Sequence, residues 1–343
     1  MYTKEFLTEE IIKIRKEIGH DNITPNIKDI YYNNNELTII TPDRPDKSII
    51  IGKGGWVVGK LREELGLNSI HIISYSDIIL QEYKLKLSLE HMNNLIKTNN
   101  LPRICEKSLN ELKTILNKRY TEIYQKEVLL DDFIQKNINK EPYNDKHDTI
   151  LALSGGVDSS FSLILAKSIG LNIKAVTINP GTIILPKQFH KNIDNLTTML
   201  NIDHKYVKID MQDTIKKSLS GKIHPCGQCS KNIHQEIDNI TKKYQIPIQI
   251  YGDLLSTTTH SITTNNNITK INMPSLLYMQ KHEIKNIITK FKVKKIKEYG
   301  CPLLHEVHKK HPHMKDYSIQ RVLRETRAGN LESGEAANLI KTI

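Results

Sequence analysis

The spacing of apolar residues over positions 1–78 predicts a small α+β domain. Helical and strand-like runs follow one another there, the helical ones at 8–18 and 56–65 and the strand-like ones at 27–32, 36–41 and 69–73. Thr8 is placed to cap the first helix, and the polar stretch 33–35 joins the first two strands as a hairpin.

Residues 79–146 carry apolar residues at helical spacing among many charges, with Pro102 as one break. We interpret this stretch as a helical connector between two larger parts of the chain. It contains no recognisable chemical motif.

Strand-like and helical runs alternate from residue 147 onward. The strand-like runs lie at 149–153, 173–178, 204–209 and 247–251, and the helical runs at 159–168, 186–200 and 230–244. This alternation predicts an α/β fold with a doubly wound parallel sheet over 147–303, with ligands at the carboxyl ends of the strands. Residues 304–343 are expected to form a basic helical C-terminal extension.

The composition of the chain predicts the kind of partner that the protein binds and the compartment in which it works. Lys and Arg outnumber Asp and Glu by 49 to 38, and the resulting net charge of +11 favours a polyanionic partner such as RNA. The chain has neither an uncharged apolar stretch of about 18 residues nor a signal-peptide core. We therefore expect a cytoplasmic protein without membrane association. The oligomeric state is left open, with a homodimer as one option.

An apolar run at 150–153 leads directly into a glycine- and serine-rich loop that precedes a helix. The loop reads Ser154-Gly155-Gly156-Val157-Asp158-Ser159-Ser160. Glycines let the backbone approach phosphate oxygens, and the N–H groups at the start of the helix supply partial positive charge. Asp158 would repel phosphate unless a cation intervenes, so we assign it Mg²⁺ coordination or bracing of the backbone. The lysine-containing P-loop of ordinary ATPases is absent.

This loop resembles the SGGxDS signature of the PP-loop ATP pyrophosphatases, which split ATP between the α and β phosphates and leave an adenylated substrate. The resemblance implies an ATP site that includes Ser154, Gly155, Gly156, Asp158, Ser159 and Ser160. In relatives the adenine lies against the ends of the second and fourth strands. The matching positions here are Thr177, Ile178, Gly252 and Asp253.

The four cysteines are too few for a disulfide scaffold in a chain of 343 residues and indicate metal or redox chemistry. Cys226 and Cys229 form a C-x-x-C on a turn that leads into a helix, where the helix dipole is expected to lower the pKa of the thiols. Cys301 follows in a Gly-Cys-Pro sequence. Cys105 lies between charged neighbours and is expected to be an ordinary structural or surface thiol.

The phosphate loop, the C-x-x-C and the distant third cysteine together resemble the iron-sulfur-dependent tRNA thiolases that make 2-thiouridine or 2-thiocytidine. This resemblance covers roughly residues 148–303 and implies that Cys226, Cys229 and Cys301 hold a 4Fe-4S cluster, with one iron left to bind the transferred sulfur. Persulfide or disulfide chemistry by the same thiols is an alternative, as are zinc binding and structural roles. Four further zinc candidates are His305, His308, His311 and His313, for which solvated or phosphate-facing positions are the alternative.

Two positions depart from the thiolase pattern. Val157 stands where those thiolases usually have Lys, which brings the loop closer to that of amidating PP-loop enzymes and other tRNA thiouridylases. Residues 254–259 carry no carboxylate, although an acidic pair is expected after Gly252.

The sequence around residue 53 resembles the I-I-G-x-x-G segment of a KH domain. It consists of Ile50 and Ile51 followed by Gly52, Lys53, Gly54 and Gly55. The resemblance implies that this turn joins two helices, that RNA approaches the glycines closely, and that Lys53 contacts phosphate.

These observations lead to the hypothesis of a tRNA sulfurtransferase in which Asp158, Cys226 and Cys229 take part in catalysis. It would use ATP, Mg²⁺ and a sulfur donor, either inorganic sulfide or a carrier protein. A sulfonucleotide reductase or an amidating PP-loop enzyme is one alternative, and neither would need to bind RNA. A non-catalytic RNA-binding protein with a relic ATP site is another. The modified tRNA position is left open.

Overall fold

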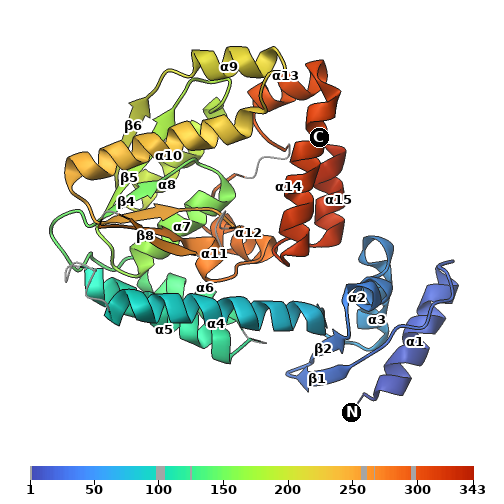
Figure 1. The fold of residues 1–343 in the computed structure, drawn as a ribbon. Helices are drawn as coiled ribbons and strands as arrows, with labels where there is room; N and C mark the ends of the chain where they lie inside the picture. Colours follow the sequence, from blue (N-terminus) through green and yellow to red (C-terminus); the bar gives the residue numbers. More distant parts are fainter. Residues whose placement is uncertain (1, 98–104, 124–125, 256–260, 266, 295–298) are drawn as a thin grey trace. The chain divides into compact units, whose positions relative to one another are not determined.

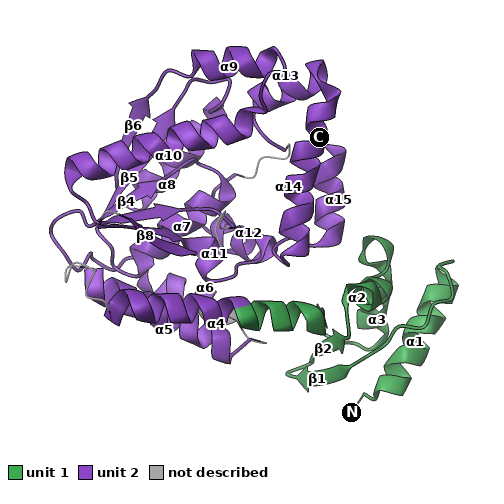
Figure 2. Cartoon of the chain, viewed as in Figure 1, with its two compact units in different colours: residues 1–83 green, residues 84–343 purple. Residues whose placement is uncertain are grey.

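The computed structural model describes residues 2–97, 105–123, 126–255, 261–265, 267–294 and 299–343. The chain folds into two compact units, residues 1–83 and residues 84–343 (Figure 2). Most of the expected connector and all of the expected C-terminal extension therefore belong to the second unit.

Unit 1 is a three-stranded mixed sheet packed against helices (Figure 1). Its elements are α1 (Lys4–Glu17), β1 (Asp29–Asn33), β2 (Glu36–Thr41), α2 (Arg44–Ile51), α3 (Trp56–Glu64), β3 (Ser69–Ser74) and the start of α4 (Tyr75–Lys97). The central strand β2 pairs antiparallel with β1 and parallel with β3. Leu7 and Ile11 of α1 pack in the core with Leu37 and Ile39 of β2.

The first helix begins earlier than its apolar pattern predicts. Thr3 is its N-cap and accepts a hydrogen bond from the backbone N–H of Phe6 at 3.1 Å. Thr8, the expected cap, lies inside the helix, where its hydroxyl donates to the carbonyl oxygen of Lys4 at 2.8 Å. The expectation for Thr8 is wrong because Thr3 satisfies the exposed N–H groups one turn earlier.

Unit 2 contains the rest of α4 and the large sheet with its helices. Before the sheet come α5 (Glu106–Thr121) and α6 (Lys126–Asn137). The alternating part consists of β4 (Thr149–Ala152), α7 (Val157–Ser168), β5 (Ile173–Asn179), α8 (Lys187–Met199), β6 (Asp203–Lys208), α9 (Gln212–Leu219), α10 (Pro225–Tyr244) and β7 (Ile248–Tyr251). It is followed by β8 (Ile262–Asn265), β9 (Ile268–Asn272), α11 (Met273–Leu276), α12 (Lys281–Thr289), α13 (Pro302–Lys310), α14 (Lys315–Arg327) and α15 (Ser333–Lys341).

The six strands are ordered β6-β5-β4-β7-β9-β8, and all neighbours are parallel except the edge pair β8 and β9. This confirms the expected α/β fold with a mostly parallel, doubly wound sheet. The chain runs outward from β4 through β5 to β6 and then crosses to β7 on the other side of β4. The carboxyl ends of β4 and β7 therefore form the point where the strand order reverses, which is where such sheets bind ligands.

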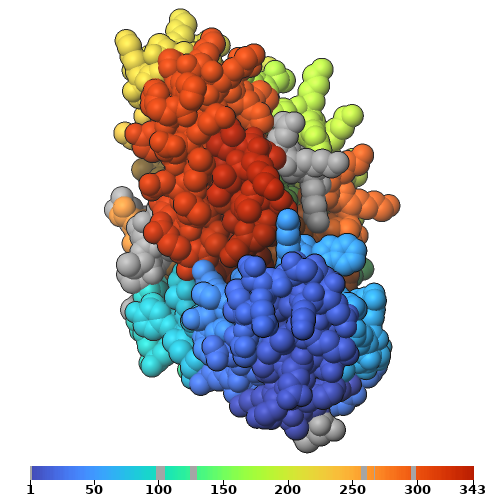
Figure 3. Space-filling view, turned by 90° about the vertical axis from the view of Figure 1, so that its right-hand side faces the viewer, coloured from blue at the N-terminus to red at the C-terminus, as the bar shows by residue number. Residues whose placement is uncertain are grey.

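The end of the chain is packed onto unit 2, where the segment shown in red covers a continuous face (Figure 3). Residues 328–330, between α14 and α15, are tied to the segment before α12 by three hydrogen bonds. The Tyr278 hydroxyl donates to the Ala328 carbonyl, the Asn330 side chain donates to the Met279 carbonyl, and the Lys281 N–H donates to the Asn330 carbonyl, each at 2.8 Å. Within the described ranges, no helix combines the length and the apolar character needed to cross a bilayer.

Candidate functional site

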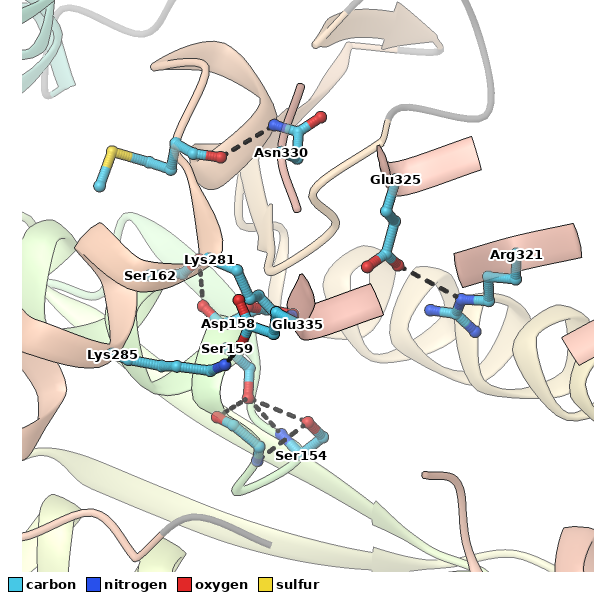
Figure 4. A network of polar contacts seen from close by, with 12 residues as sticks. Ser154, Asp158, Ser159, Ser162, Lys281, Lys285, Arg321, Glu325, Asn330 and Glu335 are labelled. Atoms are coloured by element: carbon cyan, nitrogen blue, oxygen red, sulfur yellow. Dashed lines mark hydrogen bonds and ion pairs between the residues drawn. The ribbon is translucent and has the colours of Figure 1, made fainter. Parts of the chain in front are cut away.

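The phosphate loop lies at the carboxyl end of the central strand β4 and runs into α7, as the sequence predicts. It is held by the Ser159 hydroxyl, which accepts from the Ser154 N–H at 3.1 Å and lies 2.9 Å from the Ser154 hydroxyl (Figure 4). Gly155 has φ +72°, and a Cβ there would come within 2.6 Å of the Phe189 carbonyl oxygen. Only glycine fits at this position, because any side chain would collide with α8.

Gly252 lies against the first turn of α7. A Cβ on it would approach the Ser159 nitrogen to 2.5 Å, so the end of β7 touches the loop helix directly. Thr177 also reaches the loop, since its buried hydroxyl donates to the Leu153 carbonyl at 2.7 Å. Ile178 instead packs into the core beneath α10, so only its backbone is available to a ligand.

Asp158 makes an ion pair that the sequence did not reveal. Its Oδ2 lies 2.5 Å from Nζ of Lys281, the first residue of α12 (Figure 4). The other carboxylate oxygen, Oδ1, is buried and has no hydrogen-bond partner in the structure. A buried carboxylate oxygen is rarely left without a partner, and this one is suited to a cation brought in with a nucleotide.

The start of α12 is fixed by a buried ion pair with the helix α5. Arg119 and Glu283 have side chains that are each 1% exposed, and the guanidinium lies 3.2 Å from both carboxylate oxygens. Glu283 also accepts from the backbone N–H of Gln280 at 2.7 Å and thereby closes the cap of α12. This arrangement places Lys281 beside Asp158. Nothing in the charged pattern of the connector distinguished Arg119 beforehand.

The two cysteines of the C-x-x-C lie in the first two turns of α10, which begins at Pro225 rather than near residue 230. Cys301 is the N-cap of α13. Burial raises the pKa of all three thiols, and burial together with the nearby Cys226 and Cys301 raises that of Cys229 to about 12. The expected lowering of these pKa values is therefore wrong, because desolvation outweighs the helix dipole. Because the thiols act electrostatically on one another's pKa, the three cysteines lie close together.

Across the described residues, no three His, Cys, Asp or Glu side chains converge on a point that could hold one metal ion.

Three of the four histidines near the C-terminus have polar contacts that fix their rings. Nε2 of His305 lies 2.6 Å from the Tyr299 carbonyl oxygen, and Nε2 of His311 lies 3.1 Å from the Leu219 carbonyl oxygen. His308 is buried beside the Ser318 hydroxyl, which lies 3.1 Å from its Nε2. The fourth cysteine, Cys105, is fully buried at the start of α5, where burial raises its pKa to about 12.

Helix α14 contributes two charged residues that were not anticipated. Nε of Arg321 lies 3.7 Å from a carboxylate oxygen of Glu325 (Figure 4). The positive charge of Arg321 acts on Cys226 and on Asp253, where it opposes the rise in pKa that burial causes. Glu325 in turn interacts with Asp158. Two charged side chains of α14 therefore act on different parts of the site: Arg321 on the thiol of Cys226 and Glu325 on Asp158 of the phosphate loop.

In unit 1 the G-x-x-G turn connects α2 to α3. Gly52, Gly54 and Gly55 have φ values of +72°, +66° and +78°, in the left-handed region that favours glycine. Lys53 is exposed, and the side chain of Trp56 is 73% exposed directly after the turn. A flat aromatic side chain beside an exposed lysine is suited to contact a nucleic acid.

Sheet order, phosphate loop and following helix define the second unit as an α/β domain of the PP-loop kind. The chain belongs to the same family as the uncharacterized protein MJ1638 of Methanocaldococcus jannaschii. The two are 33% identical over 248 residues, which make up 72% of this chain and 87% of that protein. No protein-family model matches the sequence.

Solved structures that match part of the chain include the following three. The U34-tRNA thiolase NcsA from Methanococcus maripaludis, with its 4Fe-4S cluster, is 14% identical with a TM-score of 0.36, over 62% of this chain and 76% of that chain. NMN synthetase from Francisella tularensis is 15% identical with a TM-score of 0.38, over 62% and 91%. The NH3-dependent NAD synthetase from Campylobacter jejuni, in complex with nitrate, is 15% identical with a TM-score of 0.32, over 63% and 91%. At these scores no function is transferred from any of them.

Proposed function

We propose that this protein is an ATP-dependent tRNA sulfurtransferase that adenylates a base carbonyl oxygen and replaces it with sulfur. The observation that carries the proposal is the meeting of a phosphate loop and three thiols in one neighbourhood of unit 2. Arg321 acts on both Cys226 and Asp253, and Asp158 of the loop helix acts on Asp253. An adenylating centre next to a sulfur centre is the arrangement that thiolation requires.

The chemistry proceeds in two displacements. The base carbonyl oxygen attacks the α-phosphorus of ATP, the bond to the β-phosphate breaks, and pyrophosphate leaves. Sulfide then bonds to the carbon, the carbon–oxygen bond breaks, and AMP carries the oxygen away. The backbone N–H groups of residues 155–159 would bind the departing pyrophosphate. Asp158 would hold Mg²⁺ through its unpaired oxygen, which is available for that role.

Cys226, Cys229 and Cys301 would hold a 4Fe-4S cluster, which supplies an iron that binds the sulfide. The thiolate form of cysteine is the form that binds iron, so binding of the cluster would release the protons of these thiols. Unit 1 would bind the tRNA through Gly52, Lys53, Gly54 and Gly55, in the manner of a KH domain.

Anaerobic purification followed by a thiolation assay tests this proposal. We expect a brown protein with about four irons per chain that forms thiolated nucleosides in tRNA from ATP, Mg²⁺ and sulfide, detected by mass spectrometry. Cys226→Ala should lose iron and sulfur transfer while it still binds ATP. Cys105→Ala is the matched control, because Cys105 is buried in α5 away from the C-x-x-C in sequence, and it should keep both.

The alternatives predict different results. Sulfur transfer by a colourless, iron-free preparation would replace the cluster with persulfide chemistry. A protein that binds ATP but no tRNA at moderate salt would be an amidating or sulfonucleotide-reducing enzyme instead. A protein that binds tRNA but never releases pyrophosphate would be a non-catalytic RNA-binding protein.

A further inference from the structure

One face of helix α14 runs from the cysteine end of the site to the phosphate loop. Ser318, Arg321 and Glu325 follow one another at spacings of three and four residues, which places them in one row on the helix. At one end, the Ser318 hydroxyl lies 3.5 Å from Nε2 of His224, two positions before Cys226. At the other end, Glu325 interacts with Lys281, the partner of Asp158.

This helix is held firmly in place at both ends. The turn after it is bound to residues 278–281 by the three 2.8 Å hydrogen bonds described above. Glu335 of the next helix makes an ion pair with Lys285 of α12 (Figure 4). At the start of α14, Ser318 contacts His308 of α13 at 3.1 Å. Arg321, in the middle of this row, therefore lies on a helix whose position is fixed at both ends.

Arg321 occupies the middle of this row and keeps hydrogen-bonding capacity for a ligand. Its contact with Glu325, at 3.7 Å, is too long for a hydrogen bond. Its side chain is 55% exposed, although it lies among groups of the site such as Cys226, Asp253 and Tyr299. A guanidinium has five N–H donors in a plane, an arrangement that matches two oxygens of one phosphate group.

We propose that Arg321 binds the α-phosphate of the nucleotide, in ATP and in the adenylated acceptor. In the proposed function the phosphate loop, which begins at the end of β4, would bind the terminal phosphates, and the α-phosphate would lie next to them on the side of the cysteines. Arg321 lies between those two ends. Its charge would neutralise the group that the carbonyl oxygen attacks and that later leaves as AMP. This inference rests on the proposed function, because it assumes an ATP site at the loop.

Equilibrium binding of two probes to the full chain tests the inference. AMP contains the α-phosphate, whereas pyrophosphate contains only the part that the loop would bind. We expect Arg321→Gln to weaken AMP binding by about tenfold to a hundredfold, as loss of a charged hydrogen bond does, and to leave pyrophosphate binding unchanged. Arg321→Lys should restore part of the AMP affinity, because it keeps the charge without the planar donors.

Arg324→Gln serves as the matched control, since it removes the same charge from an exposed position of the same helix. It should bind AMP like the unaltered protein. Equal AMP affinity in the Arg321→Gln and Arg324→Gln variants would overturn the inference and leave the proposed function standing. Weaker tRNA binding with unchanged AMP binding would overturn it as well. If the unaltered protein bound neither AMP nor pyrophosphate, the ATP site itself would be refuted.

Discussion

Arg119 shows how one residue far from the phosphate loop in sequence can determine its surroundings. Its ion pair with Glu283 is fully buried, so removal of the arginine leaves a carboxylate without a counter-charge. We expect Arg119→Met to lower the free energy of unfolding by ~3–5 kcal/mol, measured by chemical denaturation. The exposed neighbour Lys118 provides the control, and Lys118→Met should change stability little.

A double variant separates the charge effect from packing. Replacing both partners, as in Arg119→Met with Glu283→Leu, removes the stranded carboxylate and should recover most of the lost stability. If the double variant is no more stable than Arg119→Met alone, the buried charge is not the cause.

His308 makes the second unit sensitive to mild acid. Burial, together with the neighbouring His224 and Lys315, lowers the pKa of His308 from 6.5 to about 4. The folded state therefore favours the neutral imidazole, while the unfolded chain takes up a proton below pH 6.5. Stability should be constant above that pH and fall by up to ~3 kcal/mol between pH 6.5 and 4.

Thermal denaturation across this pH range measures the effect. The His308→Gln variant cannot titrate at this position, so its melting temperature should fall less between pH 7 and pH 5 than that of the unaltered protein. Identical losses in both proteins would assign the acid sensitivity to other groups.

At the scale of elements, the contact between the end of β7 and the first turn of α7 positions the phosphate loop. Gly252→Ala places a methyl group within 2.5 Å of the Ser159 nitrogen, so strand and helix must separate. We expect a loss of stability on the order of 2 kcal/mol and weaker ATP binding, measured by calorimetry. The Gly334→Ala control in α15 meets no atom within 4 Å and should fold and bind ATP normally.

Elements with strong periodicity could be predicted from the sequence, whereas those defined by packing could not. The apolar run before Ser154 predicts a central strand, because a strand buried on both faces carries no alternation. The hairpin of β8 and β9 was missed, since its threonines and asparagines resemble a loop until β9 pairs with β7. The early start of α10 was missed because Pro225 reads as a turn, although proline is also suited to the first turn of a helix.

The same distinction applies to the candidate site. The glycines, serines and cysteines could be proposed as site residues from the sequence because their motifs are local and closely spaced. Lys281, Arg321 and Glu325 were missed because they reach the site only through the docking of α12 and α14. The sequence of the basic tail does not indicate which arginine lies near the site.

At the scale of the whole molecule, the two units divide recognition from chemistry in the proposed function. Lys53→Glu in unit 1 should weaken tRNA binding severalfold and reduce its salt dependence, while ATP binding by unit 2 stays the same. Lys16→Glu makes the same charge change at an exposed position of α1 and serves as the control. Equal tRNA affinity in both variants would show that the RNA does not contact Lys53.

Trp56 provides a direct signal for this test, because it is the single tryptophan of the chain and is 73% exposed after the G-x-x-G turn. Its fluorescence should change on addition of tRNA and stay unchanged on addition of ATP. A tryptophan that responds to neither ligand would contradict contact between the turn and the RNA.

The docking of α14 and α15 also has a consequence for the order of events during synthesis. The loop that begins at Ser154 leaves the ribosome long before Arg321 and Glu335 do. The nascent chain therefore contains the phosphate loop before α14 and α15, which pack beside it, have been synthesised. The centre is complete only when the last helices emerge. A chain that ends before α14 would contain every strand of the large sheet and the phosphate loop but would lack Arg321 and Glu335.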